Sequence, residues 1–540
     1  MTPAPDRLAI RSGYLFAILS AEALALLVVG LPKTLGFLGF AFFDTGANLA
    51  GQYLISHGYR PTIDFFYPYG LIPLLFGRIW FSIFGLTPIA CVAVTPLLDI
   101  LIVWGFVRLA ANVKMNLAGI LIILLTASLT IPSGFLRLSH GIEPVFILHA
   151  LAYQAQGSRR RALALAAACL FVKPSMAYFL GLVLLAFIVL AALRGSARPI
   201  RAIVAGICPA ALVVVAIGAI LVAAFGPAPV VGTMNPSVGA AWYRAQGFGF
   251  FNGAGRSFLA SIGAPWLYYF ANVAGVWIAY TIVLVVAALT VVRKPLAEVA
   301  TIDGTDRTPE VILTCAVLHL SFILFFFGNA FSSGYYFYLL VLGLAAAARL
   351  GIGWEVLVAC LAFALPIAKV DKRLIQHFAV VRQEKSASAG SSAAGLPAMA
   401  ALPVDPAFTY QLWFTTSPSA ETAGLWATAD ERAEWIKVIA MVRGHRTAIL
   451  QYNGCADLLF PEFSPPVTFF LSPGDTFAAD VSRKISQLEA SSMIVMPRAH
   501  SGLLDDVPAI GNVVRHDFVV AFQGASFIVY ARRENYPVSR

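Results

Sequence analysis

Long apolar runs recur along this chain and restrict where it can fold. A helix needs about 20 mostly apolar residues to cross the hydrocarbon core of a bilayer. Runs of this kind, some of them short, lie at 13–31, 88–109, 115–132, 144–157, 162–173, 174–193, 202–225, 266–292, 312–327, 336–350 and 353–370. Only 12% of the 540 residues are charged, against roughly 25% in soluble domains. The sequence therefore predicts an α-helical polytopic membrane protein.

The placement of Lys and Arg predicts how these runs are oriented. Basic loops favour the cytoplasmic side of a membrane. If the stretch 69–86 is an interfacial helix rather than a span, five loops with basic residues fall on the side of Arg7 and Arg11. These loops contain Arg108, Lys114, Arg159–Arg161, Arg194, Arg198, Arg201, Arg293, Lys294, Arg307 and Arg349. We expect about eleven spans in the inner (plasma) membrane, with a retained first helix and a cytoplasmic N-terminus.

Charge and cysteine content exclude several classes of function. The formal net charge is +10, but the basic residues lie in short loops between apolar runs rather than on one face of a soluble domain. This pattern argues against nucleic acid as a partner and leaves membrane lipids as the expected surroundings. The six cysteines form no CxxC motif and no Cys/His cluster, so neither a disulfide framework nor a zinc site is expected.

A change in composition after Lys369 divides the chain. Residues 1–371 form the predicted transmembrane core, and 372–405, with a stretch rich in Ser, Ala and Gly, form a predicted flexible linker. Residues 406–540 are predicted to form a small α/β domain outside the membrane. Helical spacing appears over 430–442. Strands are predicted at 447–451, 492–496, 518–522 and 526–530.

The first segment expected outside the membrane, from about 32 to 87, carries the densest polar pattern. Residues 42–70 read FFDTGANLAGQYLISHGYRPTIDFFYPYG. Asp44 is the first acidic residue after the opening run, and a short helix is predicted over 45–56. A Gly-Tyr-Arg-Pro turn signal and an aromatic stretch follow this helix. Outer segments with their own pattern usually carry function.

This pattern resembles the GT-C superfamily of membrane glycosyltransferases. Its elements are an acidic residue, a short helix, Gly-Tyr-x-Pro, Asp-Phe and Tyr-x-Tyr-Gly, over about residues 10–200. The superfamily includes protein O-mannosyltransferases, oligosaccharyltransferase catalytic subunits and the lipid A aminoarabinose transferase. Its members share a multi-span core, interfacial helices in the first outer loop and polyprenyl-phosphate sugar donors. The resemblance implies transfer of a hexose or pentose to a glycan, lipid or protein acceptor outside the cytoplasm.

The resemblance also implies roles for individual residues. Asp44 lies where the family keeps the catalytic acid of its first loop. Thr45 replaces a second acidic residue that many relatives have, so no cofactor is assigned and a divalent cation stays open. Glu143 matches an acidic residue of the second outer loop, and Lys173 matches a basic position near the donor.

The chemistry of glycosyl transfer supports the same roles for Asp44 and Lys173, independently of the resemblance. Glycosyl transfer needs a base for the acceptor hydroxyl and cations for the departing phosphate. A carboxylate beside a low-dielectric wall, as expected for Asp44, can have its pKa raised. An ammonium in an apolar run, as at Lys173, usually has a function. Structural alternatives stay open: Asp44 can cap the following helix, Glu143 can begin a helix, and Lys173 can snorkel to the surface.

Five further residues are candidate substrate ligands. Arg244 and Arg256 lie in the long third outer segment, where a guanidinium can hold phosphate bidentately. His140 precedes Glu143 and can orient an acceptor, although a lone loop histidine is more often structural. Asp64 and Tyr69 belong to the Asp-Phe and Tyr-x-Tyr-Gly elements. For Asp64 a structural hydrogen bond is the favoured alternative.

A membrane transporter or lipid flippase with an accessory outer domain is the main alternative. Such proteins often have repeated halves and broken helices at the midplane. This sequence shows no matching halves, and its acidic candidates gather towards one surface. A scaffold with a working soluble domain is a weaker reading, because that domain has no Gly-rich phosphate loop or triad. We therefore expect an inverting glycosyltransferase with Asp44 as its acid/base.

Overall fold

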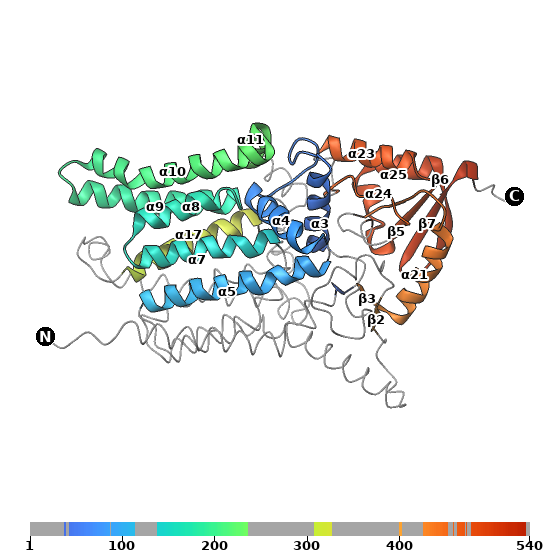
Figure 1. Cartoon of the computed structure of the whole chain (residues 1–540), viewed down its shortest axis with the longest axis horizontal. Coiled ribbons are helices and arrows are strands. Elements are labelled where there is room, and N and C mark those ends of the chain that lie inside the picture. The colour runs from blue at the N-terminus through green and yellow to red at the C-terminus, as the bar shows by residue number, and fades with distance from the viewer. Residues whose placement is uncertain are drawn as a thin grey trace, which may run out of the picture.

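The computed structural model shows a helical bundle next to a small α/β unit (Figure 1). The residues that the structure describes are 37–38, 43–86, 88–113, 138–235, 307–326, 399–401, 425–451, 457, 462–469, 471 and 477–535. The predicted spans that lie outside them are 13–31, 115–132, 266–292, 336–350 and 353–370.

The bundle helices follow the remaining apolar runs. They are α5 (Pro88–Asn112), α7 (Leu138–Ala155), α8 (Arg159–Cys169), α9 (Pro174–Gly195), α10 (Pro199–Phe225) and α17 (Thr308–Phe326). α9 and α10 each begin at a proline, which lacks an N–H that the first helical position would leave unbonded anyway. The neighbouring apolar runs 162–173 and 174–193 contain parts of two separate helices, α8 and α9. α7 packs against α5 and α8, and α8 packs against α9 and α10.

Two helices within these ranges are long and apolar enough to cross a membrane. They are α9, with 22 residues, and α10, with 27. Their most apolar windows are only 33% and 11% buried, so most of these side chains face outwards. This is compatible with a membrane protein. The total of about eleven spans, and the orientation of the chain, stay predictions.

The stretch 69–86 contains a short helix, α4 (Leu71–Phe84). Its 14 residues extend over about 21 Å at a rise of 1.5 Å per residue, which is less than the hydrocarbon core of about 30 Å. Gly85, with φ 79°, ends it. The length agrees with an interfacial helix better than with a span.

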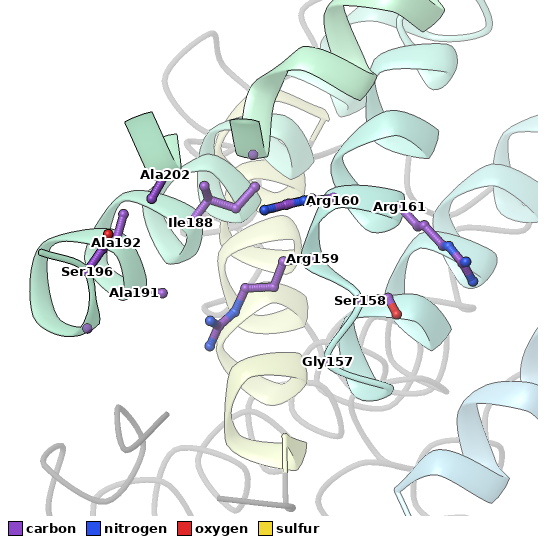
Figure 2. A pocket seen from close by; sticks show the side chains of 12 residues that line it. Gly157, Ser158, Arg159, Arg160, Arg161, Ile188, Ala191, Ala192, Ser196 and Ala202 are labelled. Atoms are coloured by element: carbon purple, nitrogen blue, oxygen red, sulfur yellow. The ribbon is translucent and has the colours of Figure 1, made fainter. Parts of the chain in front are cut away.

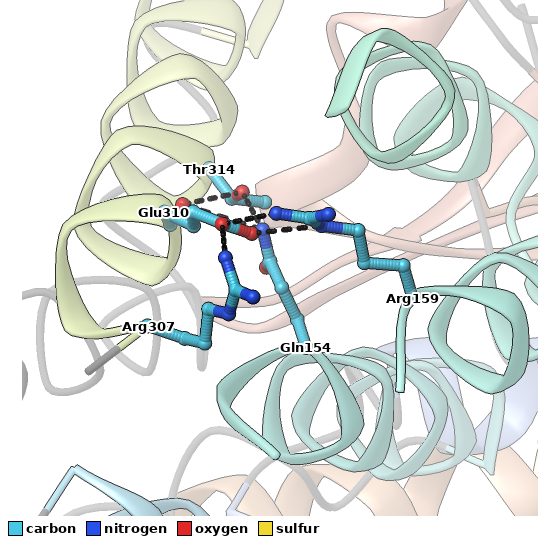
Figure 3. Close-up of polar contacts among 5 residues, drawn as sticks. All are labelled: Gln154, Arg159, Arg307, Glu310 and Thr314. Carbon is cyan, nitrogen blue, oxygen red and sulfur yellow. Dashed lines mark hydrogen bonds and ion pairs between the residues drawn. The ribbon is translucent and has the colours of Figure 1, made fainter. Parts of the chain in front are cut away.

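One end of the bundle is strongly basic. The guanidinium of Arg108 lies 4.4 Å from the centre of the Tyr153 ring, and that of Arg161 lies 5.7 Å from the same ring. Arg159 and Arg307 both form ion pairs with Glu310 (Figure 3). The ends of α7 and α9 and the starts of α8, α10 and α17 meet here (Figure 1). Those basic residues that the sequence placed on one side of a membrane and that the structure describes thus share one end of the bundle, whereas Lys114, Arg293, Lys294 and Arg349 lie outside the described residues.

The opposite end of the bundle carries two short helices, α3 (Phe43–Ser56) and α11 (Pro227–Met234), and faces the C-terminal unit (Figure 1). α3 begins at Phe43, two residues before the predicted helix start at Thr45, so Asp44 lies within its first turn. An acidic residue in a first turn is favoured by the helix dipole. α3 packs against α4, α5 and α7.

The C-terminal unit contains a four-stranded sheet in the order β4-β5-β7-β6. β4 and β5 are parallel, and β7 is antiparallel to both β5 and β6. The strands are β4 (Thr447–Ile449), β5 (Met493–Pro497), β6 (Phe518–Gln523) and β7 (Phe527–Arg532), each overlapping a predicted strand. The helices are α21 (Ala429–Val442), α23 (Ala478–Glu489), α24 (Leu503–Asp506) and α25 (Pro508–Asp517), with short 3-10 turns at Arg498–His500 and Arg533–Asn535. The predicted helix at 430–442 corresponds to α21.

A second sheet joins distant parts of the chain. β1 (Phe37–Leu38) pairs in parallel with β3 (Leu425–Thr428), and β2 (Met399–Ala401) pairs with β3 in the antiparallel direction. β2 lies inside the stretch 372–405, which the sequence predicted as a flexible linker. These three residues pair with β3 through their backbone, and the linker as a whole stays a prediction.

Candidate functional site

Three of the predicted site residues, two acidic and one basic, come from three helix starts at the end of the bundle that faces the C-terminal unit. Asp44 belongs to α3, and Glu143 lies directly before Pro144 near the start of α7. Lys173 immediately precedes Pro174, the first residue of α9. The contact of α3 with α7 brings the helix of Asp44 alongside that of Glu143. The helix predicted in the first outer segment therefore contacts the helix that begins in the second, and the placement of both segments outside the membrane stays a prediction.

Glu143 and Lys173 form a buried ion pair. Lys173 Nζ lies 3.2 Å from Glu143 Oε2, and the two side chains are only 4% and 2% exposed. Removing two charges from water costs free energy unless they are paired and further hydrogen-bonded. Buried apolar neighbours along the chain, such as Ile142 and Val172, lower the local dielectric. The sequence assigned these residues separately to acceptor and donor, whereas the structure places them in direct contact.

The backbone beside Lys173 holds the first outer loop. The N–H of Gly70 donates to the carbonyl oxygen of Val172 at 2.9 Å, and that of Ile72 donates to the carbonyl of Phe171 at 2.9 Å. A Cβ atom at Gly70 would lie 2.1 Å from both the carbonyl carbon and oxygen of Phe171. Glycine is therefore required for this close approach. The Tyr-x-Tyr-Gly element is thus fixed within a few residues of the ion pair.

Replacing Gly70 by Ala should destabilise the protein, because the added methyl meets backbone atoms that no side-chain rotation can move. We expect a loss of about 1–3 kcal/mol in unfolding free energy, measured by denaturant titration in detergent. Gly181→Ala in α9 is the matched control, since nothing lies within 4 Å of its added Cβ. Equal stability of the two variants would contradict this packing.

Asp64 organises the turn after α3. Its Oδ2 atom accepts hydrogen bonds from the backbone N–H of Arg60 at 2.7 Å and from Arg60 Nε at 3.0 Å. The hydrogen bond from the Arg60 guanidinium lowers the pKa of Asp64, so its carboxylate stays charged. Thr62, between them, has a positive φ of 65°. These contacts are those expected of a turn-forming residue, which was the favoured alternative for Asp64.

Tyr69 lies in the apolar cluster beneath the loop. It is 8% exposed, and its ring packs edge-on against that of Tyr67 at 5.5 Å between centroids. The same cluster contains Phe171 from the ion-pair segment and Val230 from α11. The loop is therefore packed between the bundle and α11. A substrate contact by Tyr69 stays a prediction.

The C-terminal unit covers the first outer loop, which the sequence did not predict. The backbone N–H of Phe66 donates to Asp480 Oδ2 of α23 at 2.7 Å, a contact between residues 414 positions apart. The ring of Tyr67 packs against Phe469 at 5.1 Å between centroids. The guanidinium of Arg483 lies 5.6 Å from the centre of the Tyr59 ring. α23 therefore lies against the loop (Figure 1).

Asp480 makes this contact dependent on pH. Burial raises its pKa from 3.8 to about 7, against the opposing effects of the Phe66 N–H and Arg483. Because the folded state holds the proton more tightly than the unfolded state, the contribution of Asp480 is fully present below pH 3.8 and is lost as pH rises to about 7.

We therefore expect the contribution of Asp480 to give the wild-type protein a higher melting temperature at pH 5 than at pH 8. Asp480→Asn keeps an acceptor for the Phe66 N–H but cannot ionise, so it should flatten this part of the pH dependence. Asp480→Ala removes the acceptor and should destabilise the contact at both pH values by about 1–3 kcal/mol. Thermal melting of the three proteins at both pH values measures this. An unchanged pH slope in Asp480→Asn would contradict the role of Asp480.

The other predicted site residues are placed only in part. His140 lies in α7, three residues before Glu143, and therefore on the same side of the helix. Arg244 and Arg256 lie outside the described residues. Within the part of the chain that the structure describes, no group of three His, Cys, Asp or Glu side chains is arranged to hold a metal ion. A divalent cation stays a prediction.

Comparison with known proteins adds no assignment to this geometry. No family model matches the chain, no characterised protein matches it, and no solved structure matches it. The buried ion pair, the anchored loop and the helix of Asp44 are therefore the features from which a function has to be inferred.

Proposed function

We propose that this protein is an inverting membrane glycosyltransferase that moves a sugar from a polyprenyl-phosphate carrier to an acceptor outside the cytoplasm. The observation that carries this proposal is the Glu143–Lys173 pair, buried and 3.2 Å apart, beside the loop that follows Asp44. Buried charges inside an apolar bundle are costly and mark substrate or ion sites by default. The resemblance of the first outer segment to GT-C enzymes suggests glycosyl transfer as the reaction in which the pair takes part.

In this proposal Asp44 acts as the general base. It accepts the proton of an acceptor hydroxyl while that oxygen attacks the anomeric carbon, and the bond from this carbon to the phosphate oxygen breaks. The departing polyprenyl phosphate takes the bonding electron pair, and the configuration at the anomeric carbon inverts. A positioned base contributes about 10²–10⁴-fold to such a step.

Lys173 and Glu143 act on the two substrates. In the free protein each neutralises the other, which keeps both charges tolerable in an apolar site. An arriving donor phosphate competes with Glu143 for the ammonium of Lys173, since a cation near the leaving oxygen stabilises its growing charge. Glu143, released from the pair, then orients the acceptor beside Asp44.

One observation favours the transporter or flippase as the second candidate. α8 has 11 residues, or about 17 Å of helix, and the buried Lys173 lies in the break between it and α9. Discontinuous helices with charges near the break are typical of transporters. A transporter would move its substrate without cleaving it, and this difference can be measured.

The test uses purified protein in liposomes with a polyprenyl-phosphate sugar and no ion gradient. Membranes from cells that lack the gene supply the acceptor, and chromatography follows the carrier. We expect the donor to disappear and free polyprenyl phosphate to accumulate only when acceptor membranes are present. An intact donor that crosses the bilayer would contradict the transferase and support the transporter.

A further inference from the structure

A pocket of about 540 Å³ lies at the basic end of the bundle, away from Glu143 and Lys173. It opens between the turn that joins α7 to α8, the end of α9 and the start of α10 (Figure 2). Ser158, Arg159 and Arg160 line one side, and Ala192, Ser196 and Ala202 line the other. The proposed transfer reaction uses none of these residues.

Among the residues that the structure describes, positive side chains outnumber negative ones around this pocket. Glu310, 2% exposed, pairs with both Arg159 and Arg307, whose Nη1 lies 2.8 Å from its Oε1 (Figure 3). Arg160 has no ion pair with any described residue, and Arg161 lies against the Tyr153 ring. Taken by themselves, the guanidinium groups of Arg159, Arg160, Arg161 and Arg307 and the carboxylate of Glu310 sum to a charge of +3.

The arginines point in different directions from α8. Arg160 extends across the pocket towards Ile188, whereas Arg161 extends away from the other pocket residues (Figure 2). Arg159 extends towards α17, where its Nε atom donates to Glu310 Oε2 at 3.2 Å. Glu310 therefore holds the guanidinium of Arg159 in place, whereas the guanidinium of Arg160 extends into the pocket and can bind a ligand there. The first turn of α8 adds backbone N–H groups, which favour an anion.

The far wall of the pocket is apolar and continues onto an outward-facing apolar surface. Ile188 and Ala202 line it. α9 and α10 approach each other so closely here that a Cβ atom at Gly206 would lie 2.6 Å from Ile188 Cγ2. Near the pocket, Leu193 of α9 is 60% exposed and Ile200 of α10 is 78% exposed. A ligand that fits both walls has an anionic head and apolar chains.

We propose that this pocket binds the phosphate of an anionic glycerophospholipid, with Arg160 on the phosphate oxygens and the acyl chains along α9 and α10. A planar guanidinium matches phosphate geometry bidentately. Basic pockets between membrane helices on the cytoplasmic side bind such head groups. The site therefore lies in the leaflet opposite the proposed transfer site.

The test measures lipid retained by the purified full-length protein by native mass spectrometry, with phosphatidylglycerol as the probe and phosphatidylcholine as the zwitterionic control. We expect phosphatidylglycerol to be retained preferentially, and Arg160→Gln to weaken its binding by about tenfold, since one charge-assisted pair is lost. Arg161→Gln removes the same charge from the adjacent position, whose side chain extends away from the other pocket residues, and should weaken binding clearly less than Arg160→Gln. Arg160→Lys, which keeps the charge, should lose less than Arg160→Gln.

Three outcomes would overturn this proposal. Equal losses in Arg160→Gln and Arg161→Gln would show a general charge effect rather than a site. Displacement of the lipid by millimolar inorganic phosphate would show a site for free phosphate. Equal retention of phosphatidylcholine and phosphatidylglycerol would show that the pocket does not recognise the net negative charge of the head group. Asp44→Asn should retain phosphatidylglycerol normally, so that failure of the transfer proposal and failure of this one can be told apart.

Discussion

Lys173→Met is expected to lower the unfolding free energy by about 3–5 kcal/mol, because it removes the ammonium that lies beside the buried carboxylate of Glu143. Glu143→Met should cost a similar amount for the same reason. The double variant, Glu143→Met with Lys173→Met, replaces both charges by apolar groups and should be close to wild type in stability. Denaturant titration of the four proteins in detergent measures these differences.

The double variant shows whether the pair of Glu143 and Lys173 serves only the stability of the fold or also the transfer reaction. We expect it to fold but to transfer no sugar, because the donor phosphate no longer meets the ammonium of Lys173 and the acceptor is no longer oriented by the carboxylate of Glu143. The matched control is the exposed pair of Arg60 and Asp64, whose side chains are 59% and 26% exposed. Arg60→Met there should cost at most about 1 kcal/mol. Wild-type transfer by the double variant would show that Glu143 and Lys173 only stabilise the fold.

Asp44→Asn is expected to lower the rate of transfer by at least about 10²-fold, while stability falls by no more than the about 0.3–1 kcal/mol that a charge gains from the helix dipole. Asparagine has the shape of aspartate but cannot accept the proton of the acceptor hydroxyl. The rate is measured as polyprenyl phosphate released per unit of folded protein. If the acceptor is a hydroxyl, hydroxide at alkaline pH can partly replace the missing base, so the loss of rate in Asp44→Asn should be smaller there. If the acceptor is a phosphate, Asp44 would serve positioning rather than proton removal, and the loss of rate should not depend on pH in this way.

Asp64→Asn is the control for Asp44→Asn. Asp64 lies in the same outer segment, and its carboxylate is occupied by Arg60. We expect this variant to change the stability of the turn and to leave the rate per folded molecule within a few-fold of wild type. A fully active Asp44→Asn protein would end the assignment of Asp44 as the base.

Local patterns in the sequence predicted local structure well. α9 and α10 follow apolar runs that begin near prolines, and the strands β4 to β7 follow short runs of β-forming residues between turn signals. The short helix α4 agrees with the interfacial placement that charge asymmetry favoured for 69–86. These features depend on neighbours in the chain, which one sequence displays directly.

Contacts between distant residues could not be predicted in the same way. The bond between Phe66 and Asp480 joins two segments that carry no shared pattern, and α23 itself was not predicted. The pairing of Glu143 with Lys173 did leave a signal. Each is an isolated charge beside a proline in apolar surroundings, and such a charge needs a partner of opposite sign. The sequence identified both residues but not their contact.

The central claim is that Asp44 lies on the extracytoplasmic side of the membrane, at the same end of the bundle as Glu143. Labelling of Asp44→Cys by a membrane-impermeant thiol reagent in intact spheroplasts tests it, after replacement of the six native cysteines. Ser196→Cys, at the basic end, is the control for the opposite side. We predict that position 44 reacts in intact cells and that position 196 reacts only after permeabilisation. Reaction of position 44 only after permeabilisation would contradict the account.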